Sequence, residues 1–377
     1  MSDEGDVYRR LQQGLDELPV AYPATESGVE LRILKRLFTP DEAEVALGLS
    51  AVPETVETLR RRLPGRTADE LESTLDRMVE KGAIFGGRML ARGGAKRYSR
   101  APLVIGMYEA QVDRLTRELQ EDFDQYLREG LASSLLRPKT KQMRTVPVDA
   151  RFVPDRLVGR YDDARRLVEE GDGPWAARNC VCRQGQDLRG EPCRQTSSRR
   201  VCLTIAAAAR ATVSAGDGEL LTREGALALL DQAEREGMVL QPANARDPLF
   251  ICLCCGCCCG VLRAAKTFPR PAEYLHSNYQ AVVDEALCSE CGTCRSRCPM
   301  EALGAGDGAT AVDLGRCIGC GLCVSTCPPE AVKLRAKARA TAPPKDMKAL
   351  YGRIMVERFG LLGVARRIGK ALLGGRV

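Results

Sequence analysis

The feature that most constrains this chain is a duplicated cysteine motif in its carboxy-terminal third. Residues 288–299 read CSECGTCRSRCP, and residues 317–328, placed 29 positions later, read CIGCGLCVSTCP. The offset holds at all four cysteines and at Pro299 and Pro328. Three thiolates spaced by two residues can wrap one loop around a metal centre, whereas the fourth cysteine, just before proline, projects away from its own loop. Each half therefore needs a fourth ligand from elsewhere in the chain.

This CxxCxxCxxxCP spacing resembles that of the bacterial ferredoxins with two 4Fe–4S clusters, and the resemblance covers roughly residues 280–336. It implies two 4Fe–4S clusters with crossed ligands. The first cluster would be held by Cys288, Cys291, Cys294 and Cys327. The second would be held by Cys317, Cys320, Cys323 and Cys298. A pair of four-cysteine zinc sites is the alternative, but these usually use two CxxC pairs separated by a longer loop.

Ten further cysteines lie upstream, in the segment 180–202 and in the run ICLCCGCCCG at residues 251–260. One metal centre cannot use ten thiols, and adjacent cysteines tend to point in different directions. We predict one further metal site, with ligands drawn from Cys182, Cys193, Cys202, Cys252, Cys254, Cys255, Cys257 and Cys258. Nearby arginines, Arg183, Arg189 and Arg194, would favour the thiolate form. A third iron–sulfur cluster is the preferred interpretation, with a structural zinc ion or a reactive dithiol as alternatives.

The composition supports sulfur-ligated metals in a reducing compartment. The chain has 377 residues, 18 cysteines and one histidine, His276, whereas disulfide scaffolds are usually short. Its first residues, MSDEGDVYRRLQQG, lack a charged segment followed by an apolar one, and no run approaches the ~18 apolar residues of a spanning helix. We therefore expect a cytoplasmic protein with reduced thiols. The net charge of +6 allows an acidic partner but does not require nucleic acid.

The region 26–105 carries several short amphipathic segments followed by a hairpin pattern. Thr39 with Glu42, and Thr67 with Glu70, fit capping boxes at helix starts. Leu71, Leu75, Met78 and Val79 form an apolar face of a helix that would end near Gly82. The following residues, AIFGGRMLARGGAKRYSRAPL, indicate two strands around a glycine-rich tip. This arrangement resembles the winged helix–turn–helix domain.

A winged helix raises the question of DNA binding. The helix expected over residues 68–81 contains five acidic and two basic residues, and DNA phosphates would repel the acidic ones. The wing is basic, with Arg88, Arg92, Lys96, Arg97 and Arg100. The balance favours docking to a protein over DNA binding.

The expected fold class is α+β, in six segments. Residues 1–25 are a lead-in, 26–105 the winged-helix-like domain, and 106–149 a connecting helix and linker with a buried stripe from Val112 to Leu127. Residues 150–275 form a cysteine-rich middle domain, which includes a capped helix from Thr222 to Gly237 and a strand at MVLQP. Residues 276–336 are the dicluster domain. Residues 337–377 are a linker and a basic amphipathic tail, suited to an anionic membrane surface, a partner protein or its own domain.

The expected function is electron transfer, by a carrier or a subunit that passes single electrons between partner redox enzymes rather than a stand-alone enzyme. No GxGxxG follows a strand pattern, so no flavin or nicotinamide site is expected. Two alternatives remain open. One is a redox-sensing winged-helix regulator of transcription. The other is an enzyme with a catalytic cysteine or metal site in the middle domain.

Overall fold

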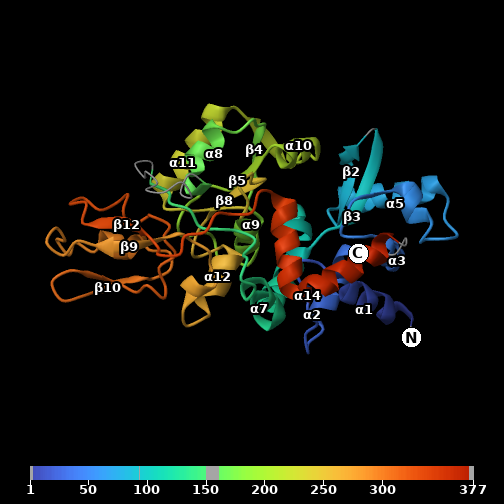
Figure 1. The fold of residues 1–377 in the computed structure, drawn as a ribbon, viewed down its shortest axis with the longest axis horizontal. Coiled ribbons are helices and arrows are strands. Elements are labelled where there is room, and N and C mark those ends of the chain that lie inside the picture. The colour runs from blue at the N-terminus through green and yellow to red at the C-terminus, as the bar shows by residue number, and fades with distance from the viewer. Residues whose placement is uncertain (1–2, 93, 150–160, 373–377) are drawn as a thin grey trace. The chain divides into compact units, whose positions relative to one another are not determined.

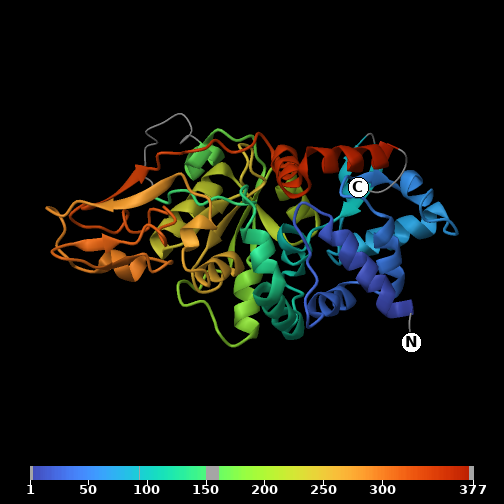
Figure 2. The ribbon, with the colours of Figure 1, turned by 60° about the horizontal axis from the view of Figure 1, so that its bottom comes forward.

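The computed structural model describes residues 3–92, 94–149 and 161–372 (Figures 1 and 2). The chain contains both helix and sheet, consistent with the α+β class, and divides into two compact units. The first comprises residues 1–138 and 352–377, and the second residues 139–351. The division at Pro138 lies at the start of a basic, proline-containing segment of the sequence.

The first unit combines helices with a small antiparallel sheet. Its first elements are α1 (Asp3–Asp16), α2 (Val29–Leu37), α3 (Pro40–Gly48), β1 (Glu54–Thr55), α4 (Val56–Arg60), α5 (Ala68–Glu80), β2 (Ile84–Arg92) and β3 (Ala95–Arg100). The three strands pair in the order β1-β3-β2, and α5 packs against β2. The hairpin predicted after residue 82 is therefore present.

The helix signals of the sequence are confirmed in this unit. Thr39 and Thr67 each accept a hydrogen bond from the N–H of Glu42 and Glu70, and both glutamates complete a capping box. Leu71, Leu75 and Met78 are buried, as predicted, whereas Val79 is only half-buried. Gly82, at a φ of 75°, follows the end of α5 and supplies the left-handed conformation that stops a helix.

The predicted connecting helix is shorter than the apolar pattern suggested. α6 (Arg117–Tyr126) begins after Thr116, whose side chain accepts a hydrogen bond from the N–H of Leu119. Asp113 has a left-handed φ of 63°, so Val112 and Leu115 precede the helix although both are buried. The neighbouring elements are η1 (Leu103–Met107), η2 (Glu109–Gln111), η3 (Leu127–Leu131) and α7 (Ala132–Leu136).

Not all of the predicted wing arginines are available at a surface. Arg100 is buried and donates hydrogen bonds to the carbonyls of Gly14, Ala46 and Leu47, so its inclusion in a basic wing was wrong. The side chains of Arg88 and Arg92 lie outside the described residues.

The second unit is built on a five-stranded antiparallel sheet with the order β6-β4-β5-β8-β7. Its elements are α8 (Ala164–Glu169), β4 (Trp175–Asn179), α9 (Val181–Leu188), β5 (Arg200–Ile205), α10 (Ala207–Ser214), β6 (Gly218–Leu221), α11 (Arg223–Glu236), β7 (Val239–Pro242), β8 (Phe250–Cys254) and α12 (Gly260–Lys266). The capped helix and the strand predicted from TREGALALLDQAEREG and MVLQP are confirmed as α11 and β7, with Thr222 and Gly237 as the caps.

The two cysteine motifs lie in the same unit, beside this sheet (Figure 1). Their segment contains η5 (Pro271–Glu273), β9 (Tyr279–Val283), α13 (Thr293–Arg297), β10 (Leu303–Ala305), β11 (Thr310–Val312) and β12 (Val332–Ala336). β9 precedes the first motif and β12 follows the second, and these two strands pair antiparallel from Tyr279–Ala336 to Val283–Val332. This pairing closes the segment around the two motifs, with the β10–β11 hairpin between them.

A buried polar network joins three parts of the second unit. Arg144 and Asp162 are both buried and form an ion pair at 3.2 Å. Asn278, just before β9, donates a hydrogen bond of 2.7 Å to the same carboxylate. Arg144 also donates to the carbonyl of Ala245, at 2.9 Å. Residues far apart in the sequence are therefore fixed to one another close to the cysteine motifs.

The helical tail predicted from Met347 onward is present as α14 (Met347–Leu372), with an interruption at Gly360, whose φ is 69°. Within the first unit, Arg358 donates a hydrogen bond of 3.0 Å to the carbonyl of Asp16, and Arg367 lies 3.6 Å from the Glu17 carboxylate. Across the described ranges, every helix is too short or too polar to span a bilayer.

Candidate metal centres

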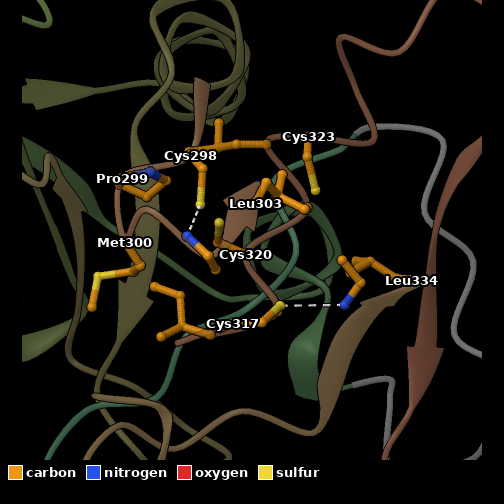
Figure 3. A pocket seen from close by; sticks show the side chains of 14 residues that line it. Cys298, Pro299, Met300, Leu303, Cys317, Cys320, Cys323 and Leu334 are labelled. Carbon is orange, nitrogen blue, oxygen red and sulfur yellow. Dashed lines mark hydrogen bonds between the residues drawn. The ribbon is translucent and has the colours of Figure 1, made fainter. Parts of the chain in front are cut away.

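Four cysteines line one pocket of the second unit, which we call the inner pocket (Figure 3). Three come from the second motif and one from the end of the first: Cys317, Cys320, Cys323 and Cys298. The remaining lining is mainly apolar and includes Ala281, Ile318, Leu322 and Leu334. The thiols of the second predicted ligand set therefore face one buried, apolar space.

The backbone beside the inner pocket packs so closely that one position has no room for a side chain. Gly319 has a φ of 63°, and a Cβ atom there would lie 2.2 Å from the carbonyl oxygen of Tyr279. The N–H groups of Ala281 and Ala302 donate to the sulfurs of Cys317 and Cys298, both at 3.3 Å (Figure 3). Such donors stabilise negative charge on a ligand sulfur.

Burial makes the thiols of the inner pocket harder to ionise. It raises the pKa of Cys320 and of Cys323, because an anion is poorly solvated in an apolar space. Thiolates in this pocket therefore need a positive partner, and a bound metal centre supplies one.

The other four motif cysteines line a second pocket, which we call the outer pocket: Cys288, Cys291, Cys294 and Cys327. It is more polar than the inner pocket, because Ser289, Thr293 and Thr310 also line it. The Thr310 hydroxyl oxygen lies 3.7 Å from the Cys294 sulfur and 4.0 Å from that of Cys288.

The thiols of the outer pocket are closer to water. Cys291 is exposed, and the hydroxyl of Thr293, 3.5 Å from its sulfur, lowers its pKa. Backbone N–H groups of Thr310 and Glu290 lower the pKa of Cys288. Each pocket therefore offers four cysteines, the inner one in a mainly apolar lining and the outer one beside hydroxyl groups and with an exposed cysteine.

The middle cysteines form two separate sets. The four-thiol group consists of Cys193, Cys255, Cys257 and Cys258, whose sulfurs all lie within 4.8 Å of one another. Cys193 comes from the loop between α9 and β5, and the other three follow the end of β8. The sulfur of Cys193 is 3.6 Å from that of Cys255 and 3.7 Å from that of Cys257. The sulfur of Cys257 is 3.5 Å from that of Cys255 and 3.6 Å from that of Cys258.

The six-thiol group consists of Cys180, Cys182, Cys202, Cys252, Cys254 and Cys259. The β5–β8 register places Cys202 directly opposite Cys252. Cys202 raises the thiol pKa of Cys252, Cys252 raises that of Cys254, and Cys254 raises that of Cys259. The Cys182 side chain lowers the pKa of Cys180 to about 7, and the negative charge of Cys180 contributes to raising the pKa of Cys252 and Cys254. The six thiols thus form one connected set on and beside the sheet.

The eight cysteines predicted to form a single middle metal site are divided between these two groups. Of its eight residues, Cys193, Cys255, Cys257 and Cys258 lie in the four-thiol group. The other four, Cys182, Cys202, Cys252 and Cys254, lie in the six-thiol group, together with Cys180 and Cys259, which the prediction did not include. The expectation that adjacent cysteines diverge was wrong for Cys257 and Cys258, because residues 256–258 form a turn.

A buried arginine lies among the middle thiols. Arg183, on α9, is 1% exposed and donates a 3.2 Å hydrogen bond to the carbonyl of Leu253. Among the described residues its Nε and Nη1 have no hydrogen-bond partner. Hydrogen bonding by Cys258, together with the Arg183 charge, lowers the pKa of Cys255 to about 4. Burial alone would lower the pKa of Arg183, but the negative charges of Cys180, Cys255 and Cys193 raise it. The groups that raise the pKa of this guanidinium are therefore thiols.

Comparison with known proteins identifies one part of the chain. Comparisons with curated proteins and with solved structures give no significant match. Residues 280–328 match the family model of the 4Fe-4S dicluster domain, and the stretch contains both cysteine motifs. The match and the clustered cysteines support an iron–sulfur electron-transfer function. The second unit therefore carries a ferredoxin-like 4Fe–4S domain.

Proposed function

We propose that this chain is an electron-transfer protein, or a subunit of an oxidoreductase complex, that holds two 4Fe–4S clusters and passes single electrons between redox partners. The observation that carries the proposal is the composition of the two pockets. Each combines three cysteines of one motif with the cysteine before proline of the other motif. This is the crossed ligand set implied by the resemblance to dicluster ferredoxins.

The residues present fit two such clusters. Cys317, Cys320, Cys323 and Cys298 would hold one, and Cys288, Cys291, Cys294 and Cys327 the other. When bound, a 4Fe–4S cluster supplies one-electron chemistry, and the protein supplies ligation, burial and docking. The apolar wall of the inner pocket excludes water, whereas the exposed Cys291 marks the surface on which we expect a redox partner to dock.

The six-thiol group is the site that we propose for a third iron–sulfur centre. It offers more thiols than the four that one cluster requires. A zinc ion or a reactive dithiol in the middle region remains an alternative. No observation favours the catalytic role that the sequence left open.

For the first unit we propose a winged-helix-like module that docks a protein partner. The order from α3 to β3 and the β1-β3-β2 sheet support this assignment. Lys96 of the hairpin lies 2.8 Å from the Glu72 carboxylate and 2.5 Å from that of Asp76, both on α5. Because the acidic helix neutralises this lysine, the surface is poorly suited to DNA phosphates.

The tail is the second surface that we propose for a partner. Leu361 and Leu362 of α14 are 75% and 79% exposed, and Arg366 and Lys370 follow on the same helix. Exposed leucines next to basic residues fit a peripheral contact with an anionic membrane or with a protein.

An electron-counting experiment tests the main proposal. The full chain, purified without oxygen, is reduced photochemically and then oxidised with measured amounts of a dye whose reduction potential lies well above those of such clusters. We expect at least about two electrons per chain, one for each ferredoxin-type cluster. The control is the double variant Cys291→Ser/Cys320→Ser, which removes one ligand from each pocket and should lose most of this capacity. A chain that takes up no electrons, or a double variant with unchanged capacity, would refute the proposal.

A further inference from the structure

We propose that the four-thiol group binds a single zinc ion in tetrahedral geometry, separately from the iron–sulfur centres. The assignment concerns Cys193, Cys255, Cys257 and Cys258 and does not depend on the electron-transfer proposal.

The inference rests on the distances between the four sulfur atoms. A zinc ion with four thiolates about 2.3 Å away at tetrahedral angles separates neighbouring sulfurs by about 3.8 Å. The four sulfur–sulfur distances that link this group lie between 3.5 and 3.7 Å. Four of the six edges of the sulfur tetrahedron therefore have nearly the length that one zinc ion requires, and the other two are no longer than 4.8 Å.

The same spacing argues against a cubane at this position. In a 4Fe–4S cluster each thiolate binds a different iron, so the body of the cluster keeps the four thiolates farther apart than around one ion. Here all four sulfurs lie within 4.8 Å of one another, and no ferredoxin-motif cysteine belongs to a set that meets this limit among the described residues. The four-thiol group therefore fits one ion better than it fits a cluster.

Local backbone structure explains how the turn presents three sulfurs to one point. β8 ends at Cys254, and the N–H of Cys259 donates to the carbonyl of Cys255 at 3.2 Å, which closes the turn. The backbone N–H groups of Cys258 and Arg194 act to lower the pKa of Cys255 and of Cys257, and so favour their thiolate forms. Backbone donors to ligand sulfurs orient thiolates in metal sites.

Charge supports an ion at this point. Four thiolates and one Zn²⁺ leave two negative charges, which are costly in a buried site unless a cation lies nearby. Arg183 is that cation, because it is fully buried and its charge interacts with Cys193 and Cys255. The groups that raise the pKa of Arg183 are thiols, which is consistent with a thiolate-bound ion as its counter-charge.

The chemistry of the donors selects zinc and a structural role. Four thiolates fill all the positions of a tetrahedral zinc ion and leave none for a substrate, which is typical of structural sites. The ion would join Cys193, in the irregular loop 189–199, to the turn after β8. Without it, the loop would keep its hydrogen bonds to α11 through Gln195 and Thr196 but would lose the link between Cys193 and this turn.

Metal analysis of matched variants tests the assignment. The full chain and four single variants are purified without oxygen, and zinc, iron and acid-labile sulfide are measured after brief treatment with a chelator. We expect about one zinc per chain in the unchanged protein, and at least a tenfold loss of zinc in Cys193→Ser and Cys258→Ser with iron and sulfide retained. The controls are Cys202→Ser, in the six-thiol group, and Cys320→Ser, in the inner pocket, which should both retain zinc.

X-ray absorption at the zinc edge of the unchanged protein supplies a second readout that does not depend on how the variants fold. Four sulfur neighbours at about 2.3 Å would support the inference. Oxygen or nitrogen neighbours would overturn it. So would a protein without zinc, or loss of iron and sulfide from Cys193→Ser and Cys258→Ser. A failure of electron uptake leaves these zinc results unchanged, so the two proposals can fail separately.

Discussion

The carbonyl oxygen of Pro299 lies 2.5 Å from the position that a Cβ atom would take at Gly256. Gly256 stands in the turn of the four-thiol group, and Pro299 follows Cys298 in the first ferredoxin motif. The two cysteine-rich regions therefore pack backbone against backbone at this point. A glycine is required here because any Cβ atom would prevent this close approach. A left-handed conformation is not the reason, because the φ of Gly256 is not positive.

Replacement of Gly256 by alanine should force these backbones apart. We expect the free energy of unfolding to fall by about 1–3 kcal/mol, the usual cost of overpacking. Thermal and denaturant unfolding without oxygen would measure it. Gly304→Ala is the matched control, because nothing lies within 4 Å of a Cβ atom at Gly304. Equal stability of the two variants would show that the contact is not tight.

Thr310→Val should lower the reduction potential of a cluster bound in the outer pocket. The hydroxyl of Thr310 lies near the sulfurs of Cys288 and Cys294, and when these are cluster-bound thiolates it can donate one hydrogen bond that stabilises the more negative, reduced state. We expect a decrease on the order of 60 mV, which is a tenfold change in a one-electron equilibrium.

A redox titration followed by paramagnetic resonance measures this change. The cluster of the inner pocket serves as the internal control, since Thr310 does not line that pocket. A shift of both potentials by the same amount, or of neither, would contradict the assignment of the hydroxyl to the outer pocket.

Asp162→Asn should destabilise the second unit strongly. The substitution keeps the shape of the side chain but leaves the buried charge of Arg144 without its carboxylate. Breaking such a pair costs about 3–5 kcal/mol. Asp231→Asn removes a half-exposed partner of Arg165 and should cost less than about 1 kcal/mol. Denaturant unfolding would measure the loss of unfolding free energy in each variant. Similar losses would mean that the buried ion pair contributes no more to stability than the surface pair.

The stability of the second unit should depend on pH through His276. Burial, with the charges of Arg144, Lys337 and Lys141, lowers the pKa of this histidine from 6.5 to about 4. The unfolded chain therefore binds a proton below about pH 6.5, and the folded protein only below about pH 4. The stabilising contribution is complete above pH 6.5 and is lost as the pH falls towards 4, by about 3 kcal/mol in total.

The variant His276→Gln isolates this effect from the protonation of other groups. The difference in unfolding free energy between the original protein and the variant should shrink between pH 6.5 and pH 4. Urea titrations at several pH values would measure it. A constant difference over this range would show that His276 is protonated equally in both states.

The parts of the structure that the sequence predicted depend on short-range patterns. The capping residues Thr39, Thr67 and Thr222 fix helix starts within a few residues of themselves. These helix starts could therefore be predicted from the local sequence. The spacing of the two motifs likewise indicates that each half needs a fourth ligand from elsewhere, and the resemblance to dicluster ferredoxins implies which cysteine supplies it.

The parts that the sequence did not predict depend on contacts between distant residues. Cys202 and Cys252 meet only through the β5–β8 register, and Cys193 reaches the turn at residues 256–258 only through the path of its loop. The alternation of Cys252 and Cys254 along a strand was the one local signal for the six-thiol group. The helix predicted before Arg117 failed because the left-handed Asp113 has no signature in the apolar pattern.

The central claim is that the carboxy-terminal cysteines hold two iron–sulfur clusters with crossed ligands. Paramagnetic resonance of the anaerobic, dithionite-reduced protein tests it most directly, with Cys298→Ser as the comparison. The account predicts the broadened signal of two interacting clusters in the original protein. In Cys298→Ser, the cluster of Cys317, Cys320 and Cys323 should change, although the substitution lies in the first motif. A reduced protein without any such signal, or a change confined to the cluster of Cys288, Cys291 and Cys294, would contradict the account.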